Sequence, residues 1–256
     1  MTYQTIELTH EAGVTRLVLN RPQVMNALNS RMRAEITTAL TDLPEASRCV
    51  VMTGAGRGFC SGQDLTDAEA ARDLEATLRD EYEPMLRAMR NCRVPVIAAV
   101  NGVAAGAGAN LALAADVVIA AESASFVQAF TRIGLVPDAG GTWIMPRLTG
   151  MARAAGAMLF ARPVPARQAA EWGMIWQAVP DDAFEAEVAA SAQHLASGPT
   201  QAYRAIREAL SAAMHQDLDA QLALEARLQG QAGRSADFVE GVTAFLEKRA
   251  PQFSGR

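Results

Sequence analysis

The 256-residue sequence lacks the features that mark several common classes of protein. No apolar run is long enough to span a membrane, and the N-terminus has no basic-then-apolar signal pattern, so we expect a cytoplasmic protein with no membrane partner. Lysine and arginine form no cluster and the net charge is −5, which argues against nucleic acid as a partner. The three cysteines, Cys49, Cys60 and Cys92, form no CxxC pair, so neither a disulfide framework nor a zinc site is predicted.

The signatures of several catalytic machineries are missing as well. There is no GxSxG elbow, no HExxH and no P-loop, which excludes the hydrolase-triad, zinc-protease and NTPase mechanisms that need them. The three histidines lie far apart in polar contexts and are not expected to act as ligands or bases. The glycines of residues 54–58 resemble a dinucleotide fingerprint, but Phe59 follows and no helical pattern begins there, so a Rossmann site is not predicted.

What is present is typical of a globular protein with a sizeable core, since half of the residues are apolar and a fifth are charged. The order strand, helix, strand recurs at uneven spacing over residues 14–181, which predicts the α/β class. From Pro199 onward only helices are predicted, at about 200–214, 218–228 and 235–249. We therefore divide the chain into a core, 1–198, and a helical region, 199–256, which should pack on its own core or on another subunit.

Local patterns place further elements in the first hundred residues. Residues 3–9 and 14–20 flank a turn and predict a hairpin, and 49–53 predict a short buried strand. Ser30 is a plausible N-cap for a helix that ends near Leu43. A charged helix is predicted from about residue 66 to 91, with an interruption near Pro84, and it could lie over the mouth of a pocket.

The centre of the chain, residues 95–121, combines two buried strands with a glycine-rich turn and a short helix of small residues. The runs 94–100 and 117–121 are short and rich in β-branched residues, which favours strands over helices. Gly102, Gly106 and Gly108 allow backbone to approach something closely, and the helix that follows presents unpaired N–H groups. Those groups suit an anionic oxygen, but close packing without any ligand explains the same pattern, so both interpretations remain open.

Two glycine-flanked turns, at residues 61–64 and 106–108, each follow a strand. If they converge, their N–H groups could form an oxyanion hole. One acidic residue, Asp138, lies in a third glycine loop. An aspartate before Ala-Gly-Gly-Thr is also a good helix N-cap, and the local sequence by itself favours the cap.

Three motifs resemble the crotonase (enoyl-CoA hydratase/isomerase) superfamily: residues 57–65 (RGFCSGQDL), 101–110 (NGVAAGAGAN) and 134–142 (GLVPDAGGT). The resemblance extends from 20–22 (NRP) to 245–249 (FLEKR). Within the superfamily, residues 135–138, 171–176 and 233–238 are similar to bacterial isomerases that convert ring-1,2-epoxyphenylacetyl-CoA to an oxepin-CoA in phenylacetate catabolism.

The resemblance implies a spiral of ββα units with a C-terminal helical trimerisation region, assembled as a homotrimer or homohexamer. It also implies a coenzyme A thioester as substrate and no separate cofactor or metal. The thioester oxygen would be held by the N–H groups of Gln63 and Ala107. The substrate-binding residues implied are Met25, Ala27, Gln63, Asp64, Leu65, Gly106, Asn110 and Phe130, with Lys248 of a neighbouring subunit near the CoA phosphates. Asp64 is also expected to hold its turn by hydrogen bonds to the backbone.

The resemblance further implies isomerisation by a single acid. The two glutamates that hydratases use match Asn110 and Phe130, neither of which can transfer the required protons. Asp138 matches the acid/base of the isomerases, and we expect Val136, Phe130 and Leu65 to raise its pKa by desolvation. The leading hypothesis is the ring-epoxide isomerase. Alternatives are a Δ3,Δ2-enoyl-CoA isomerase, less plausibly a hydratase, and, from a different class, a non-catalytic CoA-binding scaffold subunit.

Overall fold

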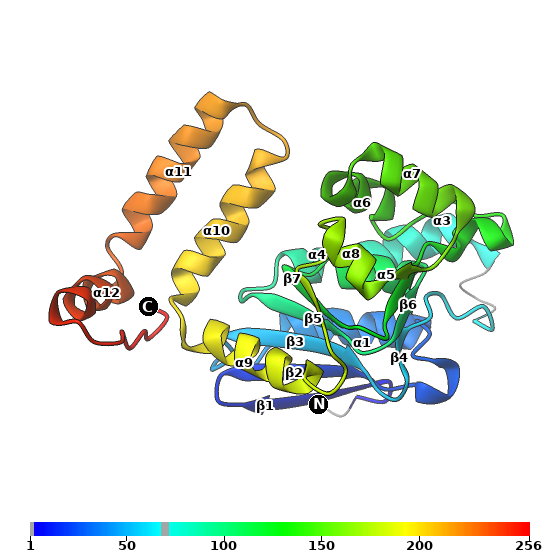
Figure 1. The fold of residues 1–256 in the computed structure, drawn as a ribbon, viewed down its shortest axis with the longest axis horizontal. Coiled ribbons are helices and arrows are strands. Elements are labelled where there is room, and N and C mark those ends of the chain that lie inside the picture. Colours follow the sequence, from blue (N-terminus) through cyan, green and yellow to red (C-terminus); the bar gives the residue numbers. More distant parts are fainter. Residues whose placement is uncertain (1–2, 68–71) are drawn as a thin grey trace.

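A computed structural model describes residues 3–67 and 72–256, and its largest feature is a six-stranded sheet (Figure 1). The strand order is β1-β2-β3-β5-β7-β10. The strands are β1 (Ile6–Glu11), β2 (Val14–Leu19), β3 (Cys49–Gly54), β5 (Val96–Val100), β7 (Val117–Ala121) and β10 (Gln177–Val179). β1 and β2 form the predicted antiparallel hairpin, and the remaining neighbours pair in parallel.

A second, four-stranded sheet carries the turns that matter for the site. It has the order β4-β6-β8-β9, with β4 (Gly58–Cys60), β6 (Val103–Ala105), β8 (Ser125–Val127) and β9 (Val164–Pro165). β3, β5 and β7 of the large sheet are each followed by a short strand of this sheet, which gives the ββα repeat of the crotonase fold. β4 and β6 were not predicted as strands, because Gly-Phe-Cys and Val-Ala-Ala are too short to show a strand periodicity.

The helices of the first half differ in detail from their predictions. α1 (Ser30–Thr41) is capped by Asn29, whose side chain accepts a hydrogen bond from the Met32 N–H at 3.0 Å, so the cap predicted at Ser30 is wrong by one residue. The charged helix consists of α3 (Leu74–Thr77), the π-helical turn η2 (Leu78–Tyr82) and α4 (Glu83–Arg90). The interruption therefore comes directly before Pro84, as predicted. The start of that predicted helix includes residues 68–71, which lie outside the described residues.

The other core helices are η1 (Pro22–Val24), α5 (Ala107–Leu113), η3 (Ala129–Ile133), α6 (Gly141–Thr149), α7 (Met151–Phe160), α8 (Ala166–Glu171) and α9 (Phe184–Ser197). α1 packs against α4, while α9 packs against β2, β3 and β7. Buried side chains from these elements, such as Met32, Met52, Met85 and Ile97, form one continuous core. No described helix is both long and apolar enough to cross a membrane.

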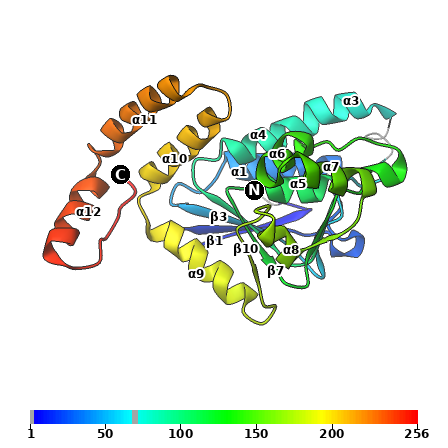
Figure 2. The ribbon, with the colours of Figure 1, turned by 45° about the horizontal axis from the view of Figure 1, so that its top comes forward.

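The predicted C-terminal helical region is an arm of three helices: α10 (Thr200–Ala213), α11 (Leu218–Ala232) and α12 (Ala236–Glu247). α10 lies beside the core, whereas α11 and α12 extend away from it (Figures 1 and 2). Arg207 on α10 anchors the arm, because its guanidinium bonds Asp116 Oδ1 at 2.7 Å and the carbonyl oxygens of Met89, Arg90 and Cys92. The other carboxylate oxygen of Asp116 accepts from the Val96 N–H, so Asp116 also holds the start of β5.

Candidate active site

The turns after β4 and β6 meet closely. Gly62 has φ +93°, and a Cβ built there would lie 2.7 Å from the Ala105 oxygen and 3.4 Å from the Ala107 nitrogen. A Cβ at Gly108 would lie 2.5 Å from the Cys60 oxygen. Only glycine allows this approach at both positions, so the close approach of backbone suggested by the glycine pattern is present.

Two N–H groups at this junction are free. Among the described residues, no protein acceptor receives a hydrogen bond from the backbone N–H of Gln63 or of Ala107. By contrast, the neighbouring N–H of Asp64 donates to Leu28 O at 3.0 Å and that of Gly106 donates to Val127 O at 2.7 Å. Ala107 is the first residue of α5, whose N-terminus adds a favourable dipole for negative charge. The pair can therefore stabilise an oxyanion.

Asp138 does not cap a helix. The N-cap of α6 is Gly140, and no side chain caps it, so the cap favoured by the local sequence is wrong. Ala139 and Gly140 both have positive φ, of 48° and 77°, and the turn they make carries the Asp138 side chain away from the start of α6. Within the described part of the chain, Asp138 Oδ1 is buried and has no hydrogen-bond partner. An unpartnered buried carboxyl oxygen is costly, and such groups are typical of functional sites.

Burial raises the pKa of Asp138 to about 6, although its own backbone N–H and the charge of Arg33 act in the opposite direction. The direction of the shift agrees with our expectation, but two of the three neighbours that we expected to cause it do not. Val136 is 78% exposed and Leu65 is 66% exposed, so neither supplies a closed apolar wall. Asp138 instead lines a cavity of about 660 Å³ together with apolar groups of the π-helical turn and α4, among them Leu78, Tyr82 and Leu86. The only other carboxylate that lines this cavity in the described chain, Glu83, is exposed and paired with Arg87.

Asn110 holds the Asp138 loop in place. Its Nδ2 donates to the Asp138 carbonyl oxygen at 2.8 Å, and its Oδ1 accepts from Gln128 Nε2 at 2.8 Å. A Cβ at Gly141 would lie 2.3 Å from Asn110 Nδ2, so glycine is needed for this contact. Asn110 is fully buried, which favours a positioning role over the direct substrate contact that was expected.

Most other predicted residues lie around the same junction. Met25 ends η1 with φ +49°, and its carbonyl oxygen accepts from the Ser61 N–H at 2.9 Å, while Ala27 is buried beside the Leu28–Gln63 bridge. The ring of Phe130 is buried 3.8 Å from a Cβ built at Gly106.

For two predicted binding residues, Asp64 and Lys248, the structure shows another role or another place. Asp64 is buried and accepts from the Thr66 N–H at 3.0 Å and pairs with Arg21 at 2.8 Å, which is the turn-holding role expected for it. Burial raises the pKa of Asp64, but the hydrogen bonds from Thr66 and Arg21 outweigh that effect and leave the pKa below its ordinary value. Lys248 ends α12 in the arm, away from the junction (Figure 1).

Sequence reasoning missed a buried network behind Gln63. Arg33 on α1 is fully buried and donates to Gln63 Oε1 at 2.9 Å, and the Tyr82 hydroxyl donates to the same oxygen at 2.5 Å. Burial raises the pKa of Tyr82, so its hydroxyl stays protonated. The available signal was one charged residue among apolar positions on the inner face of α1, next to Met32 and near Ile36.

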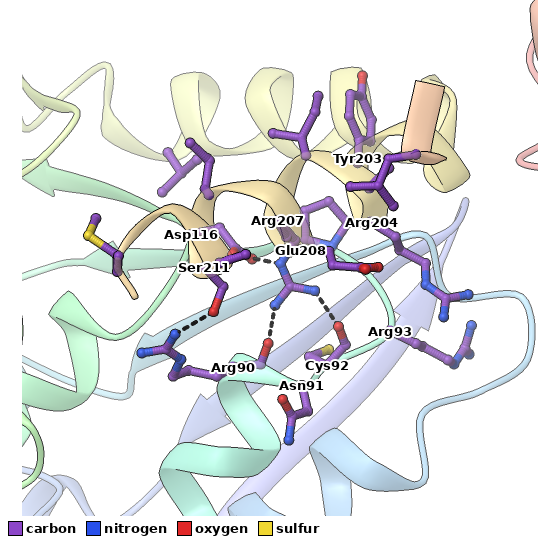
Figure 3. A pocket seen from close by; sticks show the side chains of 18 of the residues that line it. Arg90, Asn91, Cys92, Arg93, Asp116, Tyr203, Arg204, Arg207, Glu208 and Ser211 are labelled. Atoms are coloured by element: carbon purple, nitrogen blue, oxygen red, sulfur yellow. Dashed lines mark hydrogen bonds and ion pairs between the residues drawn. The ribbon is translucent and has the colours of Figure 1, made fainter. Parts of the chain in front are cut away.

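A cavity of about 1140 Å³ lies between the core and the arm helices α10 and α11 (Figure 3). Neither Asp138 nor Gln63 lines it. Its most prominent polar group, Arg207, is occupied by the anchoring bonds described above, and Arg90 donates to Ser211 at 2.8 Å. The cavity therefore follows from how the arm leaves the core, and none of the predicted site residues lines it.

Comparison with known proteins identifies the family of the chain. A family model described as enoyl-CoA hydratase/isomerase matches residues 9–256. The chain belongs to this family. It is 60% identical to a Rhodobacter capsulatus protein named probable enoyl-CoA hydratase, and the match covers 100% of both chains. It is 49% identical to the 1,2-epoxyphenylacetyl-CoA isomerase of Escherichia coli, covering 97% of this chain and 98% of that one.

Solved structures show the same fold. The enoyl-CoA hydratase of Bacillus anthracis superposes with a TM-score of 0.92 at 34% identity, covering 99% of this chain and 100% of that one. The predicted superfamily and its α/β fold are thereby confirmed. The protein is an enzyme of the crotonase superfamily, whose members bind acyl-CoA substrates. Among the described residues, no group of three or more potential ligands is arranged to hold a metal ion.

Proposed function

We propose that this enzyme is an acyl-CoA isomerase in which Gln63 and Ala107 bind the thioester oxygen and Asp138 moves the proton. Two observations carry the proposal: the N–H groups of Gln63 and Ala107 have no protein acceptor, and the buried Oδ1 of Asp138 has no hydrogen-bond partner, each among the described residues. Asn110 links them, because it lies on the helix that Ala107 begins and its Nδ2 donates to the Asp138 carbonyl oxygen. At the positions where the resemblance places the hydratase glutamates, the chain has Asn110 and Phe130. Neither side chain can activate water.

In this mechanism, the N–H groups of Gln63 and Ala107 bind the thioester carbonyl and lower the energy of the enolate. Removal of one oxyanion-hole donor costs about 3 to 4 kcal/mol in proteases that use such a hole. Asp138 takes the proton from the carbon next to the thioester and returns it to a more distant carbon, which shifts the double bond. A carboxylate of ordinary pKa is a weak base for carbon, and the raised pKa of Asp138 strengthens it.

The substrate that we propose is the ring-1,2-epoxide of phenylacetyl-CoA, with an oxepin-CoA as product in phenylacetate catabolism. The 49% identity to the Escherichia coli isomerase supports this choice. The net reaction consumes no water, which suits a site with one acid. The same apparatus would isomerise a 3-enoyl-CoA to the 2-enoyl-CoA. Hydratase activity is the second candidate, because the Rhodobacter capsulatus relative carries that name.

The decisive test compares the wild type with Asp138→Asn on three substrates: 3-enoyl-CoA, the ring-epoxide thioester made in situ, and 2-enoyl-CoA with water. We expect the wild type to isomerise the first two and the variant to lose both activities while it still binds acyl-CoA. Faster hydration than isomerisation by the wild type would assign the protein as a hydratase. Binding without turnover of any substrate would make it a CoA-binding scaffold.

We also propose that the arm assembles the enzyme into a homotrimer or homohexamer, in which Lys248 of one subunit approaches the CoA phosphates of its neighbour. The arm exposes many large apolar residues, namely Ile206, Leu210, Leu218, Leu222, Phe238, Val242 and Phe245. Exposed apolar surface of this extent is typical of a protein interface. Sedimentation equilibrium gives the subunit number, and Phe245→Asp should shift it toward the monomer.

A further inference from the structure

A buried guanidinium lies directly behind the oxyanion turn. Arg33 Nη1 donates to two acceptors, the Leu28 carbonyl oxygen at 2.8 Å and Gln63 Oε1 at 2.9 Å. Its Nε and Nη2 donate to Glu81 Oε2 at 2.9 and 2.7 Å. One fully buried side chain thus joins three segments: the strand-like bridge before α1, the turn that carries Gln63, and the helix that lines the Asp138 cavity.

Backbone hydrogen bonds on both sides of the bridge between Leu28 and Gln63 fix the position of Gln63. Leu28 N–H donates to the Gly62 oxygen at 2.7 Å, and the Leu28 oxygen accepts from the Asp64 N–H at 3.0 Å. These two bonds flank Gln63 but leave its own N–H free. The side chain of Gln63 supplies the remaining restraint, because its Oε1 accepts from both Arg33 and Tyr82. Two donors that converge on one oxygen fix the amide orientation.

We propose that Arg33 is a positioning residue: through the Gln63 side chain it fixes the turn whose backbone N–H binds the substrate oxyanion. The inference rests on the proposed function, since it assigns Arg33 a role in oxyanion binding. Planarity explains why arginine suits this place, because one guanidinium reaches Leu28, Gln63 and Glu81 with separate N–H groups. A lysine ammonium is a compact charge and could not reach all three acceptors.

A purely structural role for Arg33 makes a different prediction. Loss of a buried ion pair destabilises a protein whatever the pair does, so stability by itself does not discriminate. A positioning role also lowers the polarisation of a bound thioester in protein that remains folded. Since the oxyanion develops in the transition state, the loss appears in kcat more than in KM.

The experiment uses a CoA thioester with a dimethylaminocinnamoyl acyl group, whose absorption moves to longer wavelength when the carbonyl is polarised. The bound spectrum and the isomerase kcat and KM are measured for wild type, Arg33→Met, Gln63→Met and the double variant. Gln63→Met keeps the backbone N–H and removes only the link. We expect each single variant to lose part of the spectral shift and about tenfold or more in kcat, the scale expected for a misplaced reacting group. The double variant should lose no more than a single one, because both changes break the same link.

Arg93→Met is the matched control. The Arg93 guanidinium is half-buried and, like that of Arg33, donates to backbone, here to the carbonyl oxygens of Leu43, Pro44 and Ser47. It lies before β5, at the opposite end of the strands. We expect the control to lose stability and keep the spectral shift.

A full spectral shift and full kcat in folded Arg33→Met, or additive losses in the double variant, would overturn the inference. If Arg33→Met does not fold, an unchanged spectrum in Gln63→Met overturns it equally. Absence of any shift in the wild type would instead refute oxyanion binding by this site, and the proposed function with it.

Discussion

Replacement of Asp138 by asparagine should stabilise the folded protein at neutral pH while it abolishes isomerase activity. The carboxyl is buried with one oxygen unpartnered, and its pKa is raised from 3.8 to about 6. Asparagine has nearly the same shape and carries no charge. The active protein therefore keeps a destabilising group for its chemistry, and the variant removes it.

The sign follows from proton binding in the two states. Between pH 3.8 and about 6, the folded state holds the Asp138 proton and the unfolded state has released it, so the free energy of unfolding falls as pH rises through this window. Above the window the full cost of the ionised, buried carboxylate is present. A difference of about 2 in pKa corresponds to about 3 kcal/mol, which is the upper value because water that enters the cavity reduces it.

Urea unfolding at fixed protein concentration, at about pH 4 and about pH 7.5, measures this effect. Relative to wild type, Asp138→Asn should gain about 2 kcal/mol more at the higher pH than at the lower. Asp64→Asn is the control of opposite sign, since the pKa of Asp64 is lowered by Thr66 and Arg21 and its loss should destabilise the protein at neutral pH. A gain for Asp138→Asn that does not change with pH would refute the argument that Asp138 is a desolvated acid.

Three further outcomes test the site. The wild-type kcat/KM should fall as pH falls below about 6, because Asp138 must be ionised to accept a proton; a pH–rate profile that stays flat to pH 4.5 would contradict this. Gly141→Ala should lower kcat about tenfold, since its Cβ would lie 2.3 Å from Asn110 Nδ2 and displace the amide that holds the Asp138 carbonyl; unchanged kinetics would show that the loop needs no such support. Gly62→Ala should cost about 1 to 3 kcal/mol of stability and most of the activity, because of its φ of +93° and a Cβ 2.7 Å from the Ala105 oxygen; thermal unfolding and turnover at wild-type levels would argue against the close junction.

Much of the architecture could be read from local pattern. The hairpin, the buried strands β3, β5 and β7, and the three arm helices have strong periodicity or clear boundaries, so the chain itself specifies them. The short strands β4 and β6 could not be predicted, because a segment of three residues pairs only when neighbouring backbone is already in place. The cap of α1 was misplaced by one residue, because Asn29 and Ser30 are both good cap residues. The extended backbone of Asn29 decides between them, and the local sequence does not reveal it.

For the site, the amino-acid sequence by itself determined the candidates: the glycine turns with Gln63 and Ala107, and the acid at Asp138. The burial and the hydrogen bonding of these groups were decided only by the tertiary structure. Local sequence favoured Asp138 as a cap, but its Oδ1 is instead buried without a hydrogen-bond partner among the described residues. This burial depends on η2 and α4, which lie some fifty residues earlier in the chain. Arg33 likewise reaches Gln63 only when α1 packs beside the oxyanion turn. Desolvation and hydrogen bonding depend on the surroundings of an atom in space, so they arise only once distant segments meet.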